Sequence, residues 1–287
     1  MRINLFTDAP NHNLALMKIS AYHKARGDSI SLNHPQDPCD LSYGSWLFDF
    51  SPKYFCDIMG GPACKGLEWK RLDDISFGEF NVKPDYDLFP VDFSLGYTWE
   101  YCPRRCGFCV VPKQHNPKIH RSIWEFHDAK FSKICLLNNN TFSDPQWHET
   151  FEEIWDAQLT VKDENGYDLR LMDEEKAEAL KRTRFAKQIH FAWDRIKDEA
   201  KIITGLELAK RYKLNAMIYI LMGYDTNLEQ DLYRCQRIHD LGFDPFPMLY
   251  RQTKLLLNFR RFIYLRYYRS YKTIELAWSD YGKVAFN

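Results

Sequence analysis

The chain is organised around residues 101–111, Tyr-Cys-Pro-Arg-Arg-Cys-Gly-Phe-Cys-Val-Val. This stretch holds three cysteines in a C-x₃-C-x₂-C arrangement: Cys102, Cys106 and Cys109. The thiolates meet at one metal centre only if the backbone between them forms a tight loop, which Pro103 and Gly107 permit. Thiolates select iron–sulfur clusters, zinc or Cu(I). A structural zinc site needs a fourth ligand, and no other Cys or His stands at a matching spacing. On a [4Fe–4S] cluster, three cysteines would leave one iron open to another ligand.

At these residues the sequence resembles the radical S-adenosylmethionine enzymes, whose signature adds an aromatic residue before the last cysteine, here Phe108. The resemblance implies that the open iron binds the amino and carboxylate groups of S-adenosylmethionine, while Phe108 packs near the adenine. An electron from the cluster would then yield a 5′-deoxyadenosyl radical that removes hydrogen from a substrate. The continuation through Pro112 is similar to the cobalamin-binding and methylthiotransferase branches. The alternatives are unrelated buried cysteines, or a zinc loop with a distant fourth ligand.

Composition describes an ordinary globular chain of one or two domains. The 287 residues are 45% apolar and 16% aromatic, and Lys+Arg and Asp+Glu both total 39. This balance gives no argument for nucleic acid or membrane. The chain has neither an apolar run of membrane-spanning length nor a signal-peptide core at its start, so a cytoplasmic location is expected. A reducing compartment favours metal ligation over disulfides for clustered cysteines.

Residues 1–91 are expected to form a small Rossmann-like α/β domain, with residues 70–91 as its linker. Strand-like residues 3–6 and 29–32 flank a helical stripe at residues 14–24, as in a βαβ unit. Further strands are expected at residues 46–50 and 55–59. The layout resembles a trimmed version of the domain that precedes the core in cobalamin-dependent radical enzymes. Cobalamin itself is not expected, because no Asp-x-His-x-x-Gly motif occurs and the segment is short.

Three cysteines in this part raise the question of a second cluster: Cys39, Cys56 and Cys64. Methylthiotransferases hold a second cluster on three N-terminal cysteines, but the spacing here differs from theirs. The favoured interpretation is that these residues pack as small hydrophobic side chains.

From residue 92 to 251 strands and helices alternate. The expected strands are residues 93–98, 132–137, 167–172, 188–193, 216–222 and 243–250. The helices expected between them are residues 121–129, 145–157, 174–182 and 197–212, and one that begins at a Thr226–Glu229 capping box. Strict alternation predicts a parallel sheet with right-handed crossovers, and six units are too few for a full barrel. A partial (β/α)6 TIM-like barrel is therefore expected, and the resemblance implies the same fold.

Ligands bind at the carboxyl ends of parallel strands, so the strand ends supply the candidate cofactor-binding residues. The amides of Asn139 and Asn140 suit a zwitterionic methionyl group, with a plain Asx turn as the alternative. Arg170 suits a carboxylate, with a salt bridge as the alternative. Asp194 ends the fourth strand. Gly223 would let the backbone approach the nucleoside closely.

Two further residues are candidates for a catalytic role. His190 lies on the same face of the fourth strand as Asp194 and would shuttle a proton, or else is an ordinary core histidine. Tyr250 ends the sixth strand and would contact adenine or substrate.

The C-terminal extension, residues 252–287, begins with a basic stretch. Residues 251–272 hold seven Lys or Arg and no acidic residue, interleaved with six Phe or Tyr. Such a stretch would grip RNA through phosphates and stacked bases. The alternative is an amphipathic helix that buries its aromatic residues and leaves its cations in water.

The favoured hypothesis is therefore a radical S-adenosylmethionine enzyme that uses a [4Fe–4S] cluster and an electron donor of the flavodoxin or ferredoxin type. Its substrate would be a modified nucleoside in RNA, as in tRNA methylthiotransferases, or a small metabolite. The rival hypotheses are a nucleic-acid-binding protein whose metal loop is structural, and a scaffold that keeps a cluster without turnover.

Overall fold

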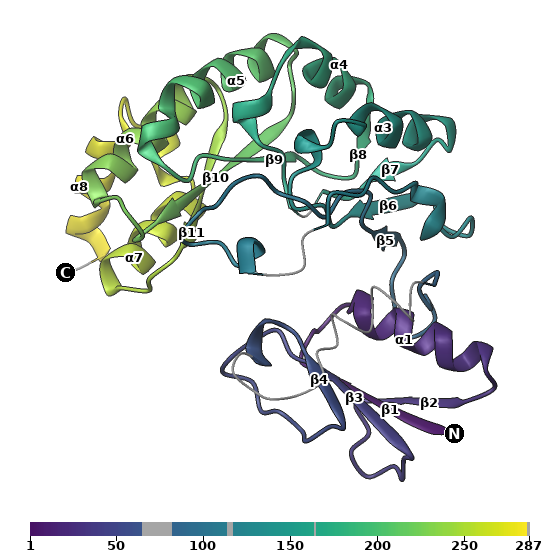
Figure 1. Ribbon diagram of the computed structural model, residues 1–287. Coiled ribbons are helices and arrows are strands. Elements are labelled where there is room, and N and C mark those ends of the chain that lie inside the picture. The colour runs from purple at the N-terminus through teal and green to yellow at the C-terminus, as the bar shows by residue number, and fades with distance from the viewer. Residues whose placement is uncertain (65–81, 114–116, 164, 286–287) are drawn as a thin grey trace. The chain divides into compact units, whose positions relative to one another are not determined.

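The computed structural model describes residues 1–64, 82–113, 117–163 and 165–285. The predicted linker 70–91 lies in large part outside these residues. The chain divides into two compact units (Figure 1). The first unit comprises Met1–Tyr97, Lys113–His115 and Arg121–Cys135. The second comprises Thr98–Pro112, Asn116–His120 and Leu136–Asn287.

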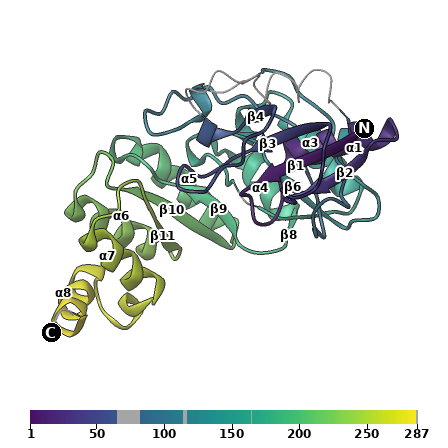
Figure 2. The same cartoon turned by 90° about the horizontal axis from the view of Figure 1, so that it is seen from below.

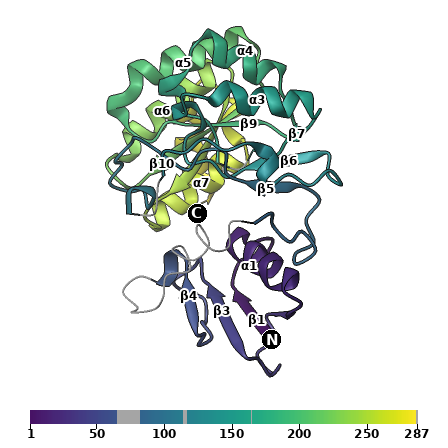
Figure 3. The same ribbon diagram turned by 45° about the vertical axis from the view of Figure 1, so that its right-hand side comes forward.

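The first unit contains a parallel sheet in the order β2-β1-β3-β4. Its strands are β1 (Arg2–Thr7), β2 (Ser29–Leu32), β3 (Leu41–Ser45) and β4 (Ile58–Gly60). Helix α1 (Leu14–Ala25) begins where the Asn13 side chain accepts from the Leu16 N–H, and it covers one face of the sheet (Figure 3). Ile3 and Leu5 of β1 pack there against the helix. The predicted strand–helix–strand start is confirmed.

The predicted strand at residues 46–50 is wrong, and β3 lies just before it. Leu47 and Phe48 donate their backbone N–H groups to the Asp8 carboxylate at 2.7 and 2.9 Å, not to a neighbouring strand. Phe50 is 86% exposed. The apolar residues of this segment therefore lie in a loop that the Asp8 side chain holds in place. The predicted strand at 55–59 begins later, at Ile58.

The first unit also contains β5 (Ser94–Gly96) and a short 3-10 helix at Ile123–Glu125. The helix predicted for residues 121–129 is thus wrong apart from that one turn. Ser122 caps the turn, and the chain leaves it at Phe126. The hydroxyl of Ser94 then accepts the Asp128 N–H at 2.9 Å, which ties the segment to β5.

The second unit contains a parallel sheet in the order β11-β10-β9. Its strands are β9 (Ile189–Ala192), β10 (Ala216–Met222) and β11 (Asp244–Leu249), joined by α5 (Glu199–Arg211) and α6 (Leu228–Asp240). Ile218 and Ile220 point to the core formed with both helices. The helices lie outside the strands, as Figure 1 shows.

The earlier part of the second unit continues this alternation with shorter strands. It contains the end of β6 (Lys133–Leu136), then α3 (Trp147–Asp156), β7 (Thr160–Val161), α4 (Glu174–Arg182) and β8 (Arg184–Phe185). β7 pairs with β8 in parallel. The strand predicted at residues 167–172 is wrong. Tyr167 forms a single parallel bridge with Phe191, and Leu169–Leu171 is a 3-10 helix capped by the Asp168 carboxylate.

The α/β class and the parallel sheets are confirmed, and the described residues form no closed barrel. At the C-terminus, α7 (Lys254–Tyr264) and α8 (Ile274–Ala285) pack on the core of the second unit (Figure 2). Phe259, Phe262 and Tyr268 are buried there, as the amphipathic-helix interpretation of this stretch requires. No helix of the described residues combines the length and apolarity needed to cross a membrane.

Candidate functional site

The cysteine loop lies against the carboxyl end of β10. A Cβ atom on Gly107 would stand 2.4 Å from the Tyr224 hydroxyl, so a larger residue there would displace the Tyr224 side chain. The Phe108 ring meets the Tyr224 ring edge-on at 5.3 Å, and Tyr224 meets Tyr250 at 5.0 Å. Gly223, with φ of 77°, makes the turn out of β10 that brings Tyr224 to the loop. The structure therefore brings together four of the predicted positions: Cys106 with its loop, Phe108, Gly223 and Tyr250.

The asparagine run after β6 holds the segment that leads into the loop. Asn138 Oδ1 accepts hydrogen bonds from the backbone N–H groups of Thr98 and Trp99 at 2.9 and 3.0 Å. Asn139 Nδ2 donates to the Glu100 carbonyl oxygen at 2.6 Å. One N–H donor of the Asn139 amide is therefore used by the loop backbone, and its predicted cofactor contact stays a prediction.

Asn140 differs from Asn138 and Asn139 because its buried side-chain oxygen has no hydrogen-bond partner among the described residues. Its Nδ2 donates to Asp168 Oδ2 at 3.1 Å and lies 3.9 Å from Cys102 Sγ. Its Oδ1 is buried without a hydrogen-bond partner among the described residues, although the residue is only 5% exposed. A buried, unpaired acceptor costs about 1–3 kcal/mol, so this atom marks a place where a donor from a ligand would be stabilised.

Asp168 and Arg170 meet at a 3-10 helix, where the sequence predicted a strand. Arg170 binds both oxygens of Asp168 at 2.7 and 3.0 Å and reaches Asp198 at 2.9 Å. Burial opposes the charge of Arg170, yet these two carboxylates raise its pKa above the ordinary value. Arg104 of the cysteine loop joins the network at 3.3 Å from Asp168. The guanidinium of Arg170 is thus paired within the protein, which is the salt-bridge alternative.

Asp194 follows β9 and is half-buried next to this network. Burial raises the pKa of its carboxyl to about 6, against the opposing charges of Arg170 and Arg234. The charge of Asp194 in turn raises the pKa of Cys106. The carboxylate therefore lies within electrostatic range of the cysteine loop, as expected for a residue of the site.

We expect the substitution Asp194→Asn to stabilise the protein at alkaline pH. The folded chain holds the Asp194 proton up to a pKa of about 6, above the ordinary value of 3.8. The folded state thus binds more protons between these values, and its stability falls as pH rises through 6. Asparagine removes this cost, which is roughly 1–3 kcal/mol at pH 8 and about half of that at pH 5. Urea unfolding of the metal-free protein measures the difference.

The exposed residue Asp240 supplies the control for this prediction, since Asp240→Asn is expected to change stability little at either pH. An Asp194→Asn effect of the same size at pH 5 and pH 8 would contradict the prediction.

The three thiols of the loop fit a sulfur-ligated cluster in their chemistry. Burial raises the pKa of Cys106 first, and the charges of Cys109 and Cys102 raise it further, so all three sulfurs share one electrostatic neighbourhood. Each is half-buried and free of disulfides. In the parts of the chain that the structure describes, no three His, Cys, Asp or Glu side chains are grouped closely enough to hold a metal. The donor set and its surroundings fit the cluster, and its binding would draw the sulfurs together.

His190 does not lie with these residues. It is the second residue of β9, before the strand end that carries Asp194. Its ring lies 4.9 Å from the ring of Tyr219. Its Nδ1 is 3.9 Å from Asp163 Oδ2 and has no hydrogen-bond partner in the described structure.

Sequence reasoning missed two residues that shape the site, Tyr224 and Arg234, and it missed the role of Asn138 in positioning the loop. Arg234 of α6 is fully buried and donates to the carbonyl oxygens of Trp193 and Leu221 at 2.6 and 2.7 Å. Asn138 and Tyr224 follow strand ends and were therefore open to prediction from their position. Arg234 carries no such signal, because it reads as one charge in a charged helix.

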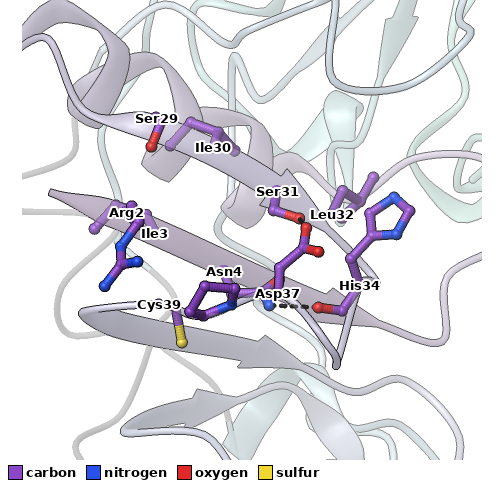
Figure 4. A pocket seen from close by; sticks show the side chains of 11 residues that line it. Arg2, Ile3, Asn4, Ser29, Ile30, Ser31, Leu32, His34, Asp37 and Cys39 are labelled. Atoms are coloured by element: carbon purple, nitrogen blue, oxygen red, sulfur yellow. Dashed lines mark hydrogen bonds between the residues drawn. The ribbon is translucent and has the colours of Figure 1, made fainter.

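The first unit has a cavity of about 700 Å³ of its own (Figure 4). It is lined by polar groups of β1, β2 and the loop after β2, among them Asn4, Ser31, Asp37 and Cys39. Ser31 donates to Asp37 at 2.6 Å, and Asn4 donates to the His34 carbonyl oxygen at 2.7 Å.

The three cysteines of the first unit have different surroundings. Cys39 is exposed, whereas Cys56 is buried in a cluster with Phe6, Trp46 and Met59, and Cys64 packs at its edge. Burial raises the pKa of Cys56 to about 12, helped by Asp57 and the other two cysteines. Cys56 therefore stays a thiol at neutral pH, as in the packing interpretation.

No protein-family model matches the chain, and a search of curated proteins found no similar one.

Proposed function

We propose that the protein is a radical S-adenosylmethionine enzyme in which Cys102, Cys106 and Cys109 hold a [4Fe–4S] cluster. The observation that carries the proposal is the place of the C-x₃-C-x₂-C loop. It lies at the carboxyl end of β10, closed by Tyr224 against Gly107 and braced by the asparagines after β6. Parallel α/β sheets bind ligands at this edge. In this proposal the strands of the second unit are a partial (β/α)6 barrel, and the first unit is Rossmann-like.

The cluster, when bound, would supply the electron that cleaves S-adenosylmethionine. The chain's own residues bind and orient the cofactor. Asn140 Oδ1, which is buried and has no hydrogen-bond partner among the described residues, would accept a hydrogen bond from the cofactor's amino group. Phe108, Tyr224 and Tyr250 form an aromatic cluster beside the loop that suits an adenine ring.

The charged residues beside the loop have two roles in this proposal. The ion pairs among Arg104, Asp168 and Arg170 fix the loop to the 3-10 helix Leu169–Leu171. Asp194, whose pKa is about 6, is ionised at neutral pH and accepts from a donor on the cofactor or the substrate. The electron donor would be a flavodoxin or a ferredoxin.

Oxygen-free reconstitution with iron and sulfide tests the proposal. We expect a brown protein with about four irons per chain, and 5′-deoxyadenosine on addition of dithionite and S-adenosylmethionine. One zinc per chain with no visible absorption would contradict it and favour a structural metal loop. A cluster that forms without any 5′-deoxyadenosine would contradict the enzyme and favour the scaffold.

A further inference from the structure

Helices cover one face of the β9-β10-β11 sheet, and the side chains on the opposite face are less deeply buried. Along β10, Ile218, Ile220 and Met222 are fully buried, whereas Met217, Tyr219 and Leu221 on the opposite face are half-buried. The strands are in parallel register, with Tyr219 beside both Ala192 of β9 and Phe246 of β11. This second face is called the ring face below.

Four rings from four elements follow one another across the ring face: His190 of β9, Tyr219 of β10, Phe246 of β11 and Tyr264 of α7. Their centroids are 4.9, 5.4 and 4.7 Å apart in that order. Tyr264 is 44% exposed, and its hydroxyl is held by the Pro247 carbonyl oxygen at 3.2 Å. A continuous aromatic surface of this kind binds flat rings, because stacking needs only a π face.

The ring face leads directly to the cysteine loop. Beyond Tyr219 and Phe246, the next residues on the same face are Leu221 and Met248, and then Gly223 and Tyr250. At about 3.3 Å per residue, Tyr219 lies roughly 13 Å before Gly223 along the strand. A ligand stacked on the rings would therefore approach the cofactor bound at the strand ends from within the same face.

Polar groups border the ring face at its far end. His190 Nδ1 is buried without a hydrogen-bond partner in the described residues and lies 3.9 Å from Asp163 Oδ2. A hollow of about 450 Å³ beside it is lined by His190, Met217, Gln188 and Asn215. A purely apolar ligand would leave His190 Nδ1 without a hydrogen-bond partner among the described residues, at a cost. A flat ring whose edge forms hydrogen bonds would stack on the four aromatic rings and also pair with His190 Nδ1.

We infer that the ring face binds the substrate of the proposed radical enzyme, and that this substrate carries a planar heteroaromatic ring of the nucleobase class. The inference rests on the proposed function. A free nucleoside and a base within RNA share this chemistry, so the two sources are separated by experiment.

Calorimetric titration of the reconstituted full-length protein with adenosine, guanosine, cytidine, uridine and bulk tRNA tests the inference. We expect saturable binding of at least one probe. We also expect Tyr219→Leu and Phe246→Leu each to raise its Kd about tenfold, which corresponds to roughly 1.4 kcal/mol of stacking. Binding of a nucleoside identifies a free substrate, and binding of tRNA alone identifies a base in RNA.

Ring-retaining and distant variants keep the test specific. Tyr219→Phe and Phe246→Tyr are expected to retain binding, which shows that a ring is required and not merely a stable fold. Tyr233→Leu, at an exposed tyrosine of α6, is expected to bind like the unmodified protein.

Two results would overturn the inference: no saturable binding by any probe, or equal binding by the leucine variants. Reductive cleavage of S-adenosylmethionine in the same preparation separates the two proposals. If cleavage occurs but no probe binds, the inference about the ring face fails and the proposed function stands. If no cluster forms, the proposed function fails.

Discussion

Substituting alanine for Cys106 is expected to abolish cluster binding and with it the formation of 5′-deoxyadenosine. Cys106 is the middle cysteine of the loop, and the other two both act on its pKa. Its loss would leave two thiolates for a cluster that needs three from this chain. Changes to residues that only orient ligands already cost 10- to 100-fold in affinity, so loss of a ligand should lower activity by more than about 100-fold. Iron content, visible absorption and product formation measure the effect.

Cys39→Ala is the matched control, because Cys39 is an exposed cysteine of the first unit. It should retain iron, colour and activity. The fold of Cys106→Ala should also be intact by circular dichroism, since the side chain is only half-buried. Full iron loading and full activity of Cys106→Ala would show that the cysteine loop does not hold the cluster.

Arg234→Met is expected to lower the free energy of unfolding by roughly 3–5 kcal/mol. Arg234 and Asp231 are both fully buried on α6 and form an ion pair at 2.5 Å. Methionine fills similar space but leaves the Asp231 carboxylate buried without its cation. It also removes the donors to the Trp193 and Leu221 carbonyl oxygens. Urea unfolding measures the loss.

Two comparisons make this second prediction specific. Arg211→Met removes an arginine that pairs with Glu174 on the surface, and it should cost less than about 1 kcal/mol. The double variant Arg234→Met with Asp231→Leu should be more stable than Arg234→Met alone, because no unpaired charge remains. A single variant as stable as the double would contradict this explanation.

Elements with a strong local pattern were predictable from the sequence. Strand β10 has the predicted bounds, because an apolar run between polar residues specifies a buried strand. Helix α4 begins at the predicted cap, Asp173, which accepts the Lys176 N–H. The capping box of α6 uses Asn227 and Gln230 in place of the predicted Thr226 and Glu229, since the sequence supports either register equally well.

The failures have a common physical cause, which is competition from tertiary hydrogen bonds. The apolar segment after β3 resembles a strand, but the carboxylate of Asp8 takes its N–H groups. The segment after Tyr167 resembles a strand as well, but Asp168 caps a 3-10 turn there. In each case a side chain competes with the sheet for the backbone, and local propensity does not reveal which partner wins.

The candidate site likewise combines residues that a local motif predicts with residues that only the fold brings together. The three cysteines and Phe108 are defined by local spacing, and their ligand roles stay predictions. The residues that position the loop are distant in sequence: Asn138 binds Thr98 and Trp99, and Tyr224 closes on Gly107. Such partners depend on which strand ends meet, so they follow from the fold and not from a motif.

The contact between Gly107 and Tyr224 also sets an order of events during synthesis. The ribosome releases the cysteines long before it makes β10 and the tyrosine that follows it. Until then the thiols lack the Tyr224 contact that packs against their loop. They are exposed in the nascent chain to oxidants and to other metal ions. In the proposed enzyme the cluster would therefore be inserted only after Tyr224 has been made, and a prematurely terminated polypeptide ending before Tyr224 would keep the complete cysteine motif without its site.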